Sequence, residues 1–426
     1  MSTAASPRRA PAPPSARGPL RLAVFTSHPI QYQAPLFRAL ASRPGVEPTV
    51  YFGSRHGLDE AADREFGTAF RWDVPLVDGY DHVFLSNRAR RPDVSRFGGI
   101  RVPDVARHWA AGRFDAALVL GWQSVGHLQA MRAAHAAGIP LLVRGESHLG
   151  TGEGSGVRAR LRRALWHPVR ERVYRRMLAR AAGVVAIGTR NADFYRHFGV
   201  AEDRLHLATY CVDNRWFALD DGERARARAG LRAGWGVGEG ATVFVASGKL
   251  VPRKRPLDVV AAAALAASAG HDVHVVFVGD GGEREALLAS AATLGIAGRV
   301  RVAGFVNQRE LPRWYAAADA LVLASEASET WGLVVNEAMA AGLPVLVSAA
   351  AGCAPDLVRE GVNGWTFPVG GAEALAGRMG ALAALPAEAR AAMGAVSRAV
   401  VGEATVERAA EVVERAARGA AARRGA

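Results

Sequence analysis

Two lysines lie five positions apart in the second half of the chain, at Lys249 and Lys254. They are the only lysines among the 53 lysine and arginine residues of the 426-residue sequence. An ammonium is a compact point charge that suits a phosphate, whereas a guanidinium binds as a planar fork. The alternative is chance, in which an arginine-rich coding bias left two lysines close together. The spacing favours a phosphate site, with the stronger indication at Lys254.

Two glutamates follow downstream, at a predicted strand-to-helix turn. Glu329 and Glu337 are separated by seven residues, and Gly332 lies between them, just before the helical run 333–341. The first amides of a helix can hold a phosphate, and the helix dipole adds to the attraction. A carboxylate accepts hydrogen bonds from sugar or ribose hydroxyls. A single glutamate near a helix start could simply compensate the helix dipole. The prediction of a sugar site therefore depends on the whole segment that contains both glutamates and the glycine.

Polar and aromatic side chains also follow three predicted strands of the first half. These strands lead into residues 27–35, 121–124 and 144–148. Loops at the carboxyl ends of parallel strands share one edge of a sheet, so we expect the three segments to line one cleft. Any single histidine among them could be an ordinary core or surface residue. Taken together they predict a second site, with candidates His28, Gln31, Trp122, Glu146 and His148.

Parallel sheets would bring these residues together. Short apolar runs alternate with helical stretches through both halves, which is typical of βαβ units. The predicted strands are residues 21–26, 49–53, 116–121, 139–144 and 183–188, then 242–248, 273–279, 300–303, 320–324 and 344–348. We therefore expect an α/β protein with two doubly wound domains, 19–210 and 211–403, and then a helix and frayed tail over 404–426.

The composition fits a globular chain with two cores, because 50% of the residues are apolar. Cys211 and Cys353 cannot form a disulfide framework, so we expect a reducing cytoplasm. Residues 1–18 are rich in proline and arginine and predict a disordered tail rather than a signal peptide. No apolar run is long enough to span a bilayer. The net charge of +13 favours acidic partners such as nucleotide phosphates, but nothing indicates a nucleic-acid module.

The segments around the lysines and glutamates resemble glycosyltransferase family 4, which has the GT-B fold. Gly248, Lys249 and Lys254 match its Gly-Arg/Lys-Leu segment, which has a lysine five residues further on. The second match is to the family's E-x7-E motif, through Glu329, Trp331, Gly332, Leu333 and Glu337. The resemblance extends over most of the chain, from Pro19 to Glu403.

The resemblance implies a retaining transferase that moves a sugar from a nucleotide-sugar donor to an acceptor hydroxyl, with no cofactor and no metal. Such enzymes act in cell-surface polysaccharide, glycolipid or glycoconjugate biosynthesis. The amino-terminal domain would bind the acceptor and the carboxyl-terminal domain the donor, across an interdomain cleft. The sequence also lacks an Asp-x-Asp triplet and a His/Cys metal cluster.

The family's residue roles transfer to matching positions. Lys249 and Lys254 would bind the diphosphate, Glu329 the donor sugar and Glu337 the ribose. The amides of Gly332 and Leu333 would bind phosphate or sugar. The resemblance also implies that the loop of Phe305 meets the nucleobase and that His148 contacts the donor sugar. The catalytic candidates are thus His148, Lys254 and Glu329, and the wider donor set adds Gly248, Lys249, Phe305, Trp331, Gly332, Leu333 and Glu337.

The chain departs from the family pattern in two places. After Gly352 the family often has a second glycine and then a glutamate, where this chain has Cys353 and Asp356. After the first strand the family commonly has a Gly-Gly pair, where this chain has His-Pro-Ile-Gln over residues 28–31. We therefore expect the contacts to the donor sugar and the acceptor to differ from those of the family.

Residues 158–180 form a strongly basic segment in which Pro168 should break or kink a helix. Apolar residues recur there at every fourth position: Leu161, Leu165, Val169, Val173 and Met177. One interpretation is peripheral contact with anionic membrane at the inner face, as in relatives that glycosylate lipid-linked acceptors. The interpretation favoured by the sequence is a helix whose apolar stripe packs on its own domain.

Two rival functions stay open at this point. Another GT-B enzyme, a sugar-nucleotide epimerase or a phosphorylase, would have the same fold, but the E-x7-E context argues against it. A non-catalytic binding module would also keep the fold. The presence of every matched charged residue argues against a binding module.

Overall fold

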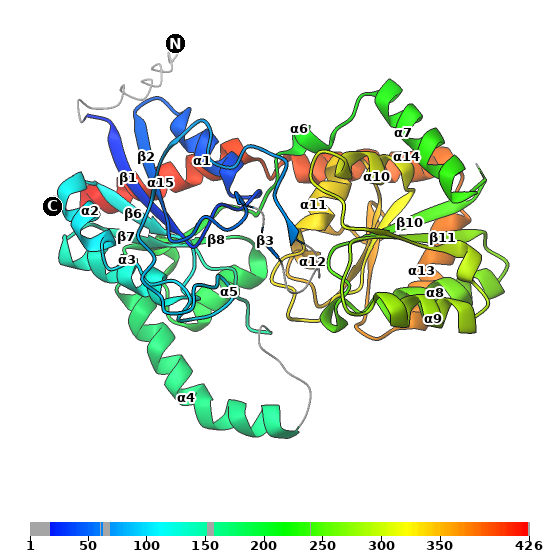
Figure 1. Cartoon of the computed structure of the whole chain (residues 1–426), viewed down its shortest axis with the longest axis horizontal. Coiled ribbons are helices and arrows are strands. Elements are labelled where there is room, and N and C mark those ends of the chain that lie inside the picture. The colour runs from blue at the N-terminus through cyan, green and yellow to red at the C-terminus, as the bar shows by residue number, and fades with distance from the viewer. Residues whose placement is uncertain (1–17, 60, 63–68, 151–156, 239, 425–426) are drawn as a thin grey trace, which may run out of the picture.

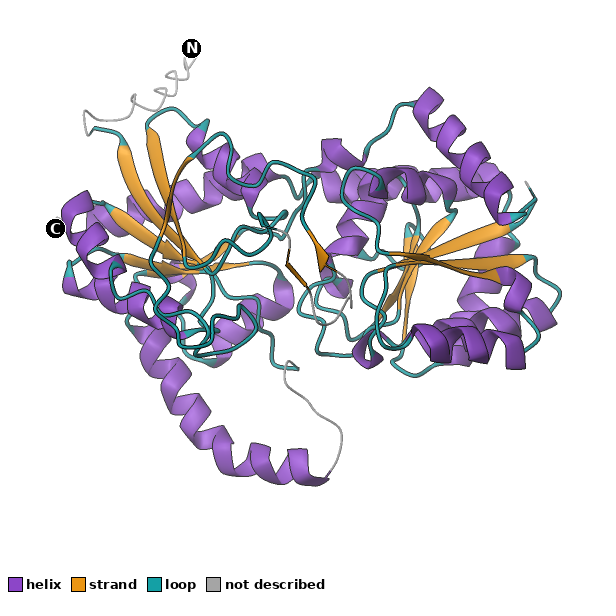
Figure 2. Cartoon of the chain, viewed as in Figure 1, coloured by secondary structure: helices purple, strands orange, loops and turns teal. Residues whose placement is uncertain are grey.

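The computed structural model describes residues 18–424, apart from residue 60, residues 63–68, residues 151–156 and residue 239. Two parallel sheets, each with helices on both faces, form two domains that lie side by side (Figures 1 and 2). The predicted disordered tail falls outside the described residues, except for Gly18. Side chains are not described for residues 61–70 and 157–167 either.

The amino-terminal sheet has the order β5-β2-β1-β6-β7-β8-β9, and all its neighbouring strands are parallel. Its strands are β1 (Leu20–Thr26), β2 (Val46–Phe52), β5 (Asp81–Phe84), β6 (Ala116–Val119), β7 (Leu141–Val143), β8 (Gly183–Ala186) and β9 (Leu205–Leu207). A small antiparallel pair, β3 (Ala61–Ala62) and β4 (Ala69–Phe70), lies apart from this sheet. The central strands are apolar throughout because helices cover both faces.

The carboxyl-terminal sheet has the order β12-β11-β10-β13-β14-β15 and is also parallel. Its strands are β10 (Thr242–Ser247), β11 (Val273–Val278), β12 (Val300–Gly304), β13 (Ala320–Leu323), β14 (Val345–Ser348) and β15 (Gly364–Phe367). The ten strands predicted from the sequence are confirmed, and so is the doubly wound α/β class. The edge strands β5, β9 and β15 were not predicted.

Fifteen helices are described. Those of the first half are α1 (Ala34–Ala41), α2 (Val105–Gly112), α3 (Val125–Ala136), α4 (Val157–Ala179) and α5 (Thr189–His197). The others are α6 (Asn214–Phe217), α7 (Asp221–Trp235), α8 (Pro256–Ser268), α9 (Arg284–Thr293), α10 (Leu311–Ala317), α11 (Leu333–Ala340), α12 (Ala354–Leu357), α13 (Ala372–Ala383), α14 (Ala387–Gly402) and α15 (Val406–Arg424). Buried apolar residues fill both faces of each sheet.

Helix α15 returns from the second domain to the first. Its buried face, including Val413, Ala417 and Ala420, shares a core with β1 and α1, and Figure 1 shows it running along the amino-terminal sheet. The stretch that was expected to fray is helical as far as Arg424. Arg423 donates to the carbonyl of Ala182 at 3.1 Å, which fixes this end to the first domain.

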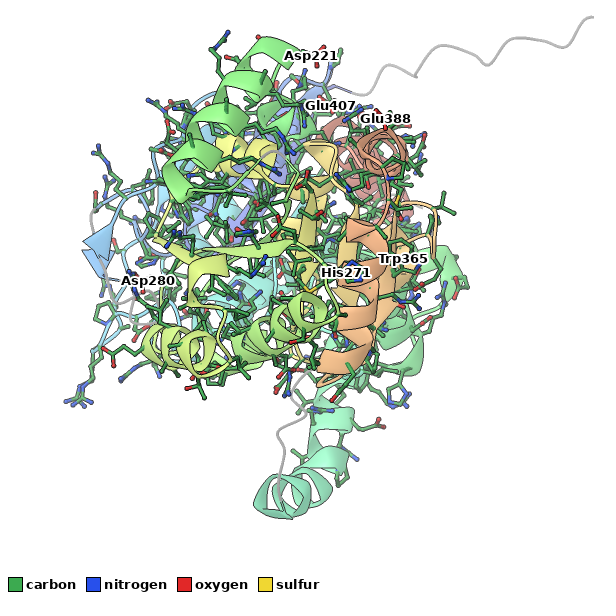
Figure 3. The ribbon with its side chains drawn as sticks, turned by 90° about the vertical axis from the view of Figure 1, so that its right-hand side faces the viewer. Asp221, His271, Asp280, Trp365, Glu388 and Glu407 are labelled. Carbon is green, nitrogen blue, oxygen red and sulfur yellow. The ribbon has the colours of Figure 1, made fainter. Side chains whose placement is uncertain are left out.

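Helix α4 continues through Pro168 and is bent along its length (Figure 1), and it projects from the body in both views (Figures 1 and 3). Only its last turns pack as the favoured interpretation required, because Met177 and Leu178 join the core. Val169 and Val173 are 49% and 56% exposed, so this part of the apolar stripe does not pack on its own domain. Leu161 and Leu165 lie outside the described side chains.

Candidate active site

Lys254 and Glu329 form an ion pair at the carboxyl edge of the second sheet. Lys254 ends a short 3-10 turn, Pro252–Lys254, that follows β10, and α8 starts two residues later at Pro256. Glu329 lies in the loop between β13 and α11. Its Oε2 also accepts a hydrogen bond from the Ser325 hydroxyl at 2.9 Å. The two residues singled out by separate motifs are therefore in direct contact.

The ion pair sets the charge state of Glu329. Burial alone would raise its pKa, but the charge and hydrogen bond of Lys254, together with Ser325, outweigh burial and leave the pKa lowered. Glu329 therefore stays ionised near neutral pH, and it holds the ammonium of Lys254 in a fixed position. A carboxylate ready to accept hydrogen bonds thus lies beside a cation suited to phosphate.

Gly248, Lys249 and Lys254 line one cavity of about 30 Å³ at the carboxyl ends of β10 and β13. That volume holds about one water molecule. The backbone of Gly248 has a φ of +130°, which a residue with a side chain rarely adopts. The cavity therefore lies where open α/β sheets bind ligands, beyond the strand ends.

Helix α11 begins beside the acidic residue of the pair. Gly332 precedes Leu333 with a φ of +102°, and a β-carbon there would lie 2.7 Å from the Leu323 side chain. The same β-carbon would lie only 3.7 Å from Cγ of Glu329, so the helix start and this carboxylate are neighbours. The amide of Val335 in the first turn donates to the carbonyl of Gly332 at 2.9 Å. The amides that begin a helix generally lack an intrahelical acceptor, so those that precede Val335 suit an anionic ligand.

Glu337 lies within α11 and is completely buried. Its Oε2 accepts a hydrogen bond from the Tyr315 hydroxyl at 2.5 Å, and Tyr32 of the first domain lies near enough to lower the pKa of the same carboxyl group. Its Oε1 has no partner among the described residues. Burial raises the pKa of Glu337 to about 7, although both tyrosines and Lys254 oppose the rise.

His148 extends from the first domain to the loop that carries Glu329. It is 4% exposed, its Nδ1 accepts from the Gly150 amide at 3.1 Å, and its Nε2 lies 3.3 Å from the carbonyl oxygen of Glu329. Since Nδ1 accepts, Nε2 carries the proton and donates to that carbonyl. The structure thus brings together the three predicted catalytic residues, His148, Lys254 and Glu329.

Two other predicted donor residues, Trp331 and Phe305, make aromatic contacts. The indole of Trp331 is buried in the core, where its Nε1 donates to Asn336 at 2.8 Å and its ring packs against Gly188. Its side chain therefore contributes packing rather than a surface for the donor. Phe305 follows β12, and its ring lies beside Trp72 of the first domain, with centroids 6.3 Å apart.

The acceptor-side candidates follow the adjacent strands β1, β6 and β7, as predicted. Trp122 stacks on Phe194 at 6.0 Å within an aromatic core group. Glu146 accepts a hydrogen bond from the Tyr210 hydroxyl at 2.7 Å.

The other two candidates lie on the loop after β1. The ring of His28 contacts Ser27 at 2.9 Å, and burial, followed by His56 and His127, lowers its pKa to about 3. Gln31 lines a pocket between the two domains.

Sequence reasoning missed the residues that join the domains. The Asp356 carboxylate accepts from the amide of Thr189 at 3.1 Å and from its hydroxyl at 2.8 Å. The guanidinium of Arg190 donates to the carbonyls of Ala349 and Ala350. Asp356, at one of the two places where the chain departs from the family pattern, thus contacts the first domain. No local signal in the sequence could have paired it with Thr189.

Solved structures that are similar to this chain share its architecture over nearly its whole length. The Anabaena protein Alr3699/HepE, solved in complex with UDP and glucose, has a TM-score of 0.68 at 18% identity and covers 93% of this chain and 98% of its own. WaaG, a glycosyltransferase involved in lipopolysaccharide biosynthesis, has a TM-score of 0.60 at 18% identity, with coverage of 93% and 98%. The chain has the GT-B fold.

Sequence matches fall within this GT-B framework. Residues 228–400 match the family described as glycosyl transferases group 1. D-inositol 3-phosphate glycosyltransferase 1 of Catenulispora acidiphila is 37% identical over 198 residues, which is 44% of this chain and 46% of the relative. The 2-deoxystreptamine glucosyltransferase of Streptomyces kanamyceticus is 33% identical over 182 residues, 42% of this chain and 46% of the relative. The matches thus span less than half of these curated relatives, and they support a glycosyltransferase.

The described residues also bear on metal binding and on membrane insertion. Within the described ranges, no group of three or more His, Cys, Asp and Glu side chains could hold a metal ion. No helix in that part of the chain combines the length and apolar character needed to cross a membrane.

Proposed function

We propose that the chain is a family 4, retaining glycosyltransferase that transfers a sugar from a nucleotide-sugar donor to an acceptor hydroxyl. The observation that carries the proposal is the Lys254–Glu329 pair, which lies at the strand ends beside the start of α11 and faces His148 of the other domain. The charged diphosphate of the donor, the donor sugar and the imidazole of His148 from the opposite domain would then lie close together. The curated relatives and the group 1 match support the same chemistry.

The proposed chemistry rests on stabilising the leaving group. As the bond to the sugar breaks, negative charge grows on the departing nucleoside diphosphate. Lys249, Lys254 and the first amides of α11 would offset this charge in a site that excludes water. Glu329 would hold the sugar hydroxyls, and His148 would contact the sugar from the amino-terminal side. No cofactor or metal takes part in this proposal, so a chelator should leave the rate unchanged.

The acceptor is proposed to be a glycan or a lipid-linked molecule of cell-surface polysaccharide or glycoconjugate biosynthesis, used by a cytoplasmic enzyme. The exposed Val169 and Val173 lie on the projecting helix α4 among arginines, which supports peripheral contact with anionic membrane. Flotation with anionic and with neutral vesicles tests this contact. Replacing both valines with glutamate should abolish any preference for anionic vesicles, and equal flotation of all samples would argue against the contact.

The decisive experiment begins with a thermal-shift screen against UDP-, GDP-, dTDP- and ADP-sugars, since ligands of the folded state raise its melting temperature. The stabilising donor is then incubated with candidate acceptors, and the anomeric configuration of the product is read by NMR. An inverted product would contradict retention. Conversion of the donor without acceptor, to an epimer or with phosphate to a sugar phosphate, would favour the rival enzymes.

A further inference from the structure

Helix α5 of the amino-terminal domain lies next to the carboxyl-terminal domain (Figure 1), and its first turn makes hydrogen bonds across the boundary. The guanidinium of Arg190 donates from Nη1 to the carbonyl of Ala350 at 2.7 Å and from Nη2 to the carbonyl of Ala349 at 2.5 Å. Its neighbour Thr189 donates from its amide and its hydroxyl to the carboxylate of Asp356. The first turn of α5 therefore holds the chain that follows β14.

Segment 349–353, which joins β14 to α12, also contacts the loop of Glu329. The amide of Gly352 donates to the carbonyl of Glu329 at 3.1 Å, and the next amide donates to a carbonyl two residues further along that loop at 3.0 Å. The two backbones lie so close that a β-carbon at Gly352 would come within 1.9 Å of the Thr330 carbonyl oxygen. A shift of segment 349–353 would therefore displace the Glu329 loop as well.

The same turn of α5 holds the loop of His148. The side-chain amide of Asn191 is buried and donates to the carbonyl of Ser147 at 2.6 Å. Ser147 precedes His148, whose Nε2 lies 3.3 Å from the carbonyl oxygen of Glu329. This carbonyl is thus contacted by His148 and by the amide of Gly352, and neighbouring residues of α5 hold both.

We propose that Arg190 is a positioning residue for the transfer reaction. When the two domains are closed, its guanidinium holds segment 349–353, and that segment places Glu329 beside the donor sugar. When the domains open, these bonds break and the Glu329 loop loses part of its support. The inference rests on the proposed function, because that function makes Glu329 the ligand of the donor sugar. It adds a residue that acts through the backbone to those that determine turnover.

An arginine suits this role because of its shape. A guanidinium is planar and presents several N–H groups in a fixed fork, so it can bind two successive carbonyl oxygens at once. Hydrogen bonds from a charged donor are also stronger than neutral ones. Arg190 therefore fixes the direction of the peptide groups of Ala349 and Ala350 as well as their position.

Cys353 reports on this segment without any ligand. Its thiol is fully buried at the end of segment 349–353, whereas Cys211 is buried in the core that contains β1 and α15. Arg190→Met keeps the length of the side chain and removes its donors. Alkylation of the full chain by N-ethylmaleimide, followed at each thiol by mass spectrometry, should accelerate about tenfold at Cys353 and less than about twofold at Cys211. Unchanged alkylation at Cys353, or equal acceleration at both thiols, overturns the proposal.

Steady-state kinetics test the link to Glu329, with the donor that the thermal-shift screen identifies. Arg190→Met should lower kcat about tenfold or more and leave the donor KM within about threefold, because Lys249, Lys254 and α11 still hold the diphosphate. An unchanged kcat, or a rise in KM alone, would contradict a positioning role. In a Glu329→Gln background, the added Arg190→Met change should lower kcat by less than about twofold. A full tenfold loss in that background would show that Arg190 acts elsewhere.

Arg196→Met is the matched control on the same helix. The guanidinium of Arg196 pairs with Asp193 and Glu202 of its own domain, and its side chain is 45% exposed. This change should leave kcat, the donor KM and the alkylation of Cys353 within about twofold of the unaltered chain. Losses equal to those of Arg190→Met would mean that removing any arginine of α5 has the same effect, which contradicts the proposal.

Failure of the positioning role and failure of the proposed function are distinguishable. If Glu329→Gln lowers turnover and Arg190→Met does not, the donor site stands and the positioning role is removed. If the unaltered chain neither binds nor turns over any nucleotide-sugar of the screen, the proposed function is removed, and the positioning role is overturned with it.

Discussion

Replacing Glu337 with glutamine should stabilise the ligand-free protein at neutral and alkaline pH, although it should weaken nucleotide binding. The side chain is fully buried, and its pKa is raised from an ordinary value of 4.5 to about 7. The folded protein therefore holds this proton more tightly than the unfolded chain. As pH rises from the lower to the higher value, the unfolded chain releases the proton first, and the folded state loses stability.

The pKa difference sets the size of the effect. A shift of that size corresponds to about 3 kcal/mol once pH exceeds the folded-state value, and to below about 1 kcal/mol near pH 5. Glutamine keeps an acceptor for Tyr315 and has no ionisation to penalise. Its stability relative to the unaltered chain should therefore increase by about 2 kcal/mol between about pH 5 and pH 8.

Urea unfolding at several pH values measures this difference, and Glu329→Gln is the matched control with the opposite sign. The pKa of Glu329 is lowered because Lys254 and Ser325 outweigh burial. The stability that it contributes is present above its ordinary pKa and is lost as pH falls through the folded-state value. Glu329→Gln should therefore destabilise the protein at neutral pH, and the loss should shrink in acid.

One result would refute this reasoning. If Glu337→Gln and the unaltered chain showed the same pH dependence of unfolding, the carboxyl group would not be penalised in the folded state. The enclosure of Glu337 would then be looser than its burial and its bond to Tyr315 indicate, and water would reach Glu337 in solution.

Three further outcomes are expected. Lys254→Ala should lower donor turnover by roughly a hundredfold, worth about 3 kcal/mol, because a positioned charge is lost; a steady-state assay at saturating donor checks this, and an unchanged rate would eliminate the role. Asp356→Asn should weaken the contact with Thr189 and raise the radius of gyration of the free protein in small-angle scattering, whereas an unchanged radius would show that other contacts suffice. Arg232→Leu should cost about 3–5 kcal/mol in urea unfolding, since it leaves Asp319 buried with a weakened partner set; a loss below about 1 kcal/mol would contradict the role of this pair.

The sequence predicted the interior of both sheets and missed most edges. Strands such as β1 and β10 are buried on both faces and read as continuous apolar runs. The strands β5, β9 and β15 are short and partly exposed, so their composition resembles that of loops. Their place in the sheet depends on pairing with a neighbour distant in the chain, which local pattern does not record.

The candidate site likewise contains some residues that the sequence could predict and others that it could not. Lys254 and Glu329 could be predicted because each follows a strand in a recognisable string, and strand ends in a parallel sheet meet at one edge. Trp331 also lies in a recognisable motif, but its indole points into the core, where it contacts Asn336 and Gly188. Tertiary packing determines this orientation, so the motif could not predict it. The packing of Tyr32 against the core of the carboxyl-terminal domain joins the two domains, and nothing in either segment specifies the other.

The return of α15 means that the polypeptide passes between the domains twice. The first passage lies just before α6 and the second between α14 and α15, and the Asn214 amide ties them by donating to the carbonyl of Val401 at 3.0 Å. A single connector would let one lobe swivel in any direction, whereas two tethered connectors restrict the motion to rotation about an axis through both. Opening for substrate entry would then follow one path, and each closure would return Tyr32 and His148 to the same positions.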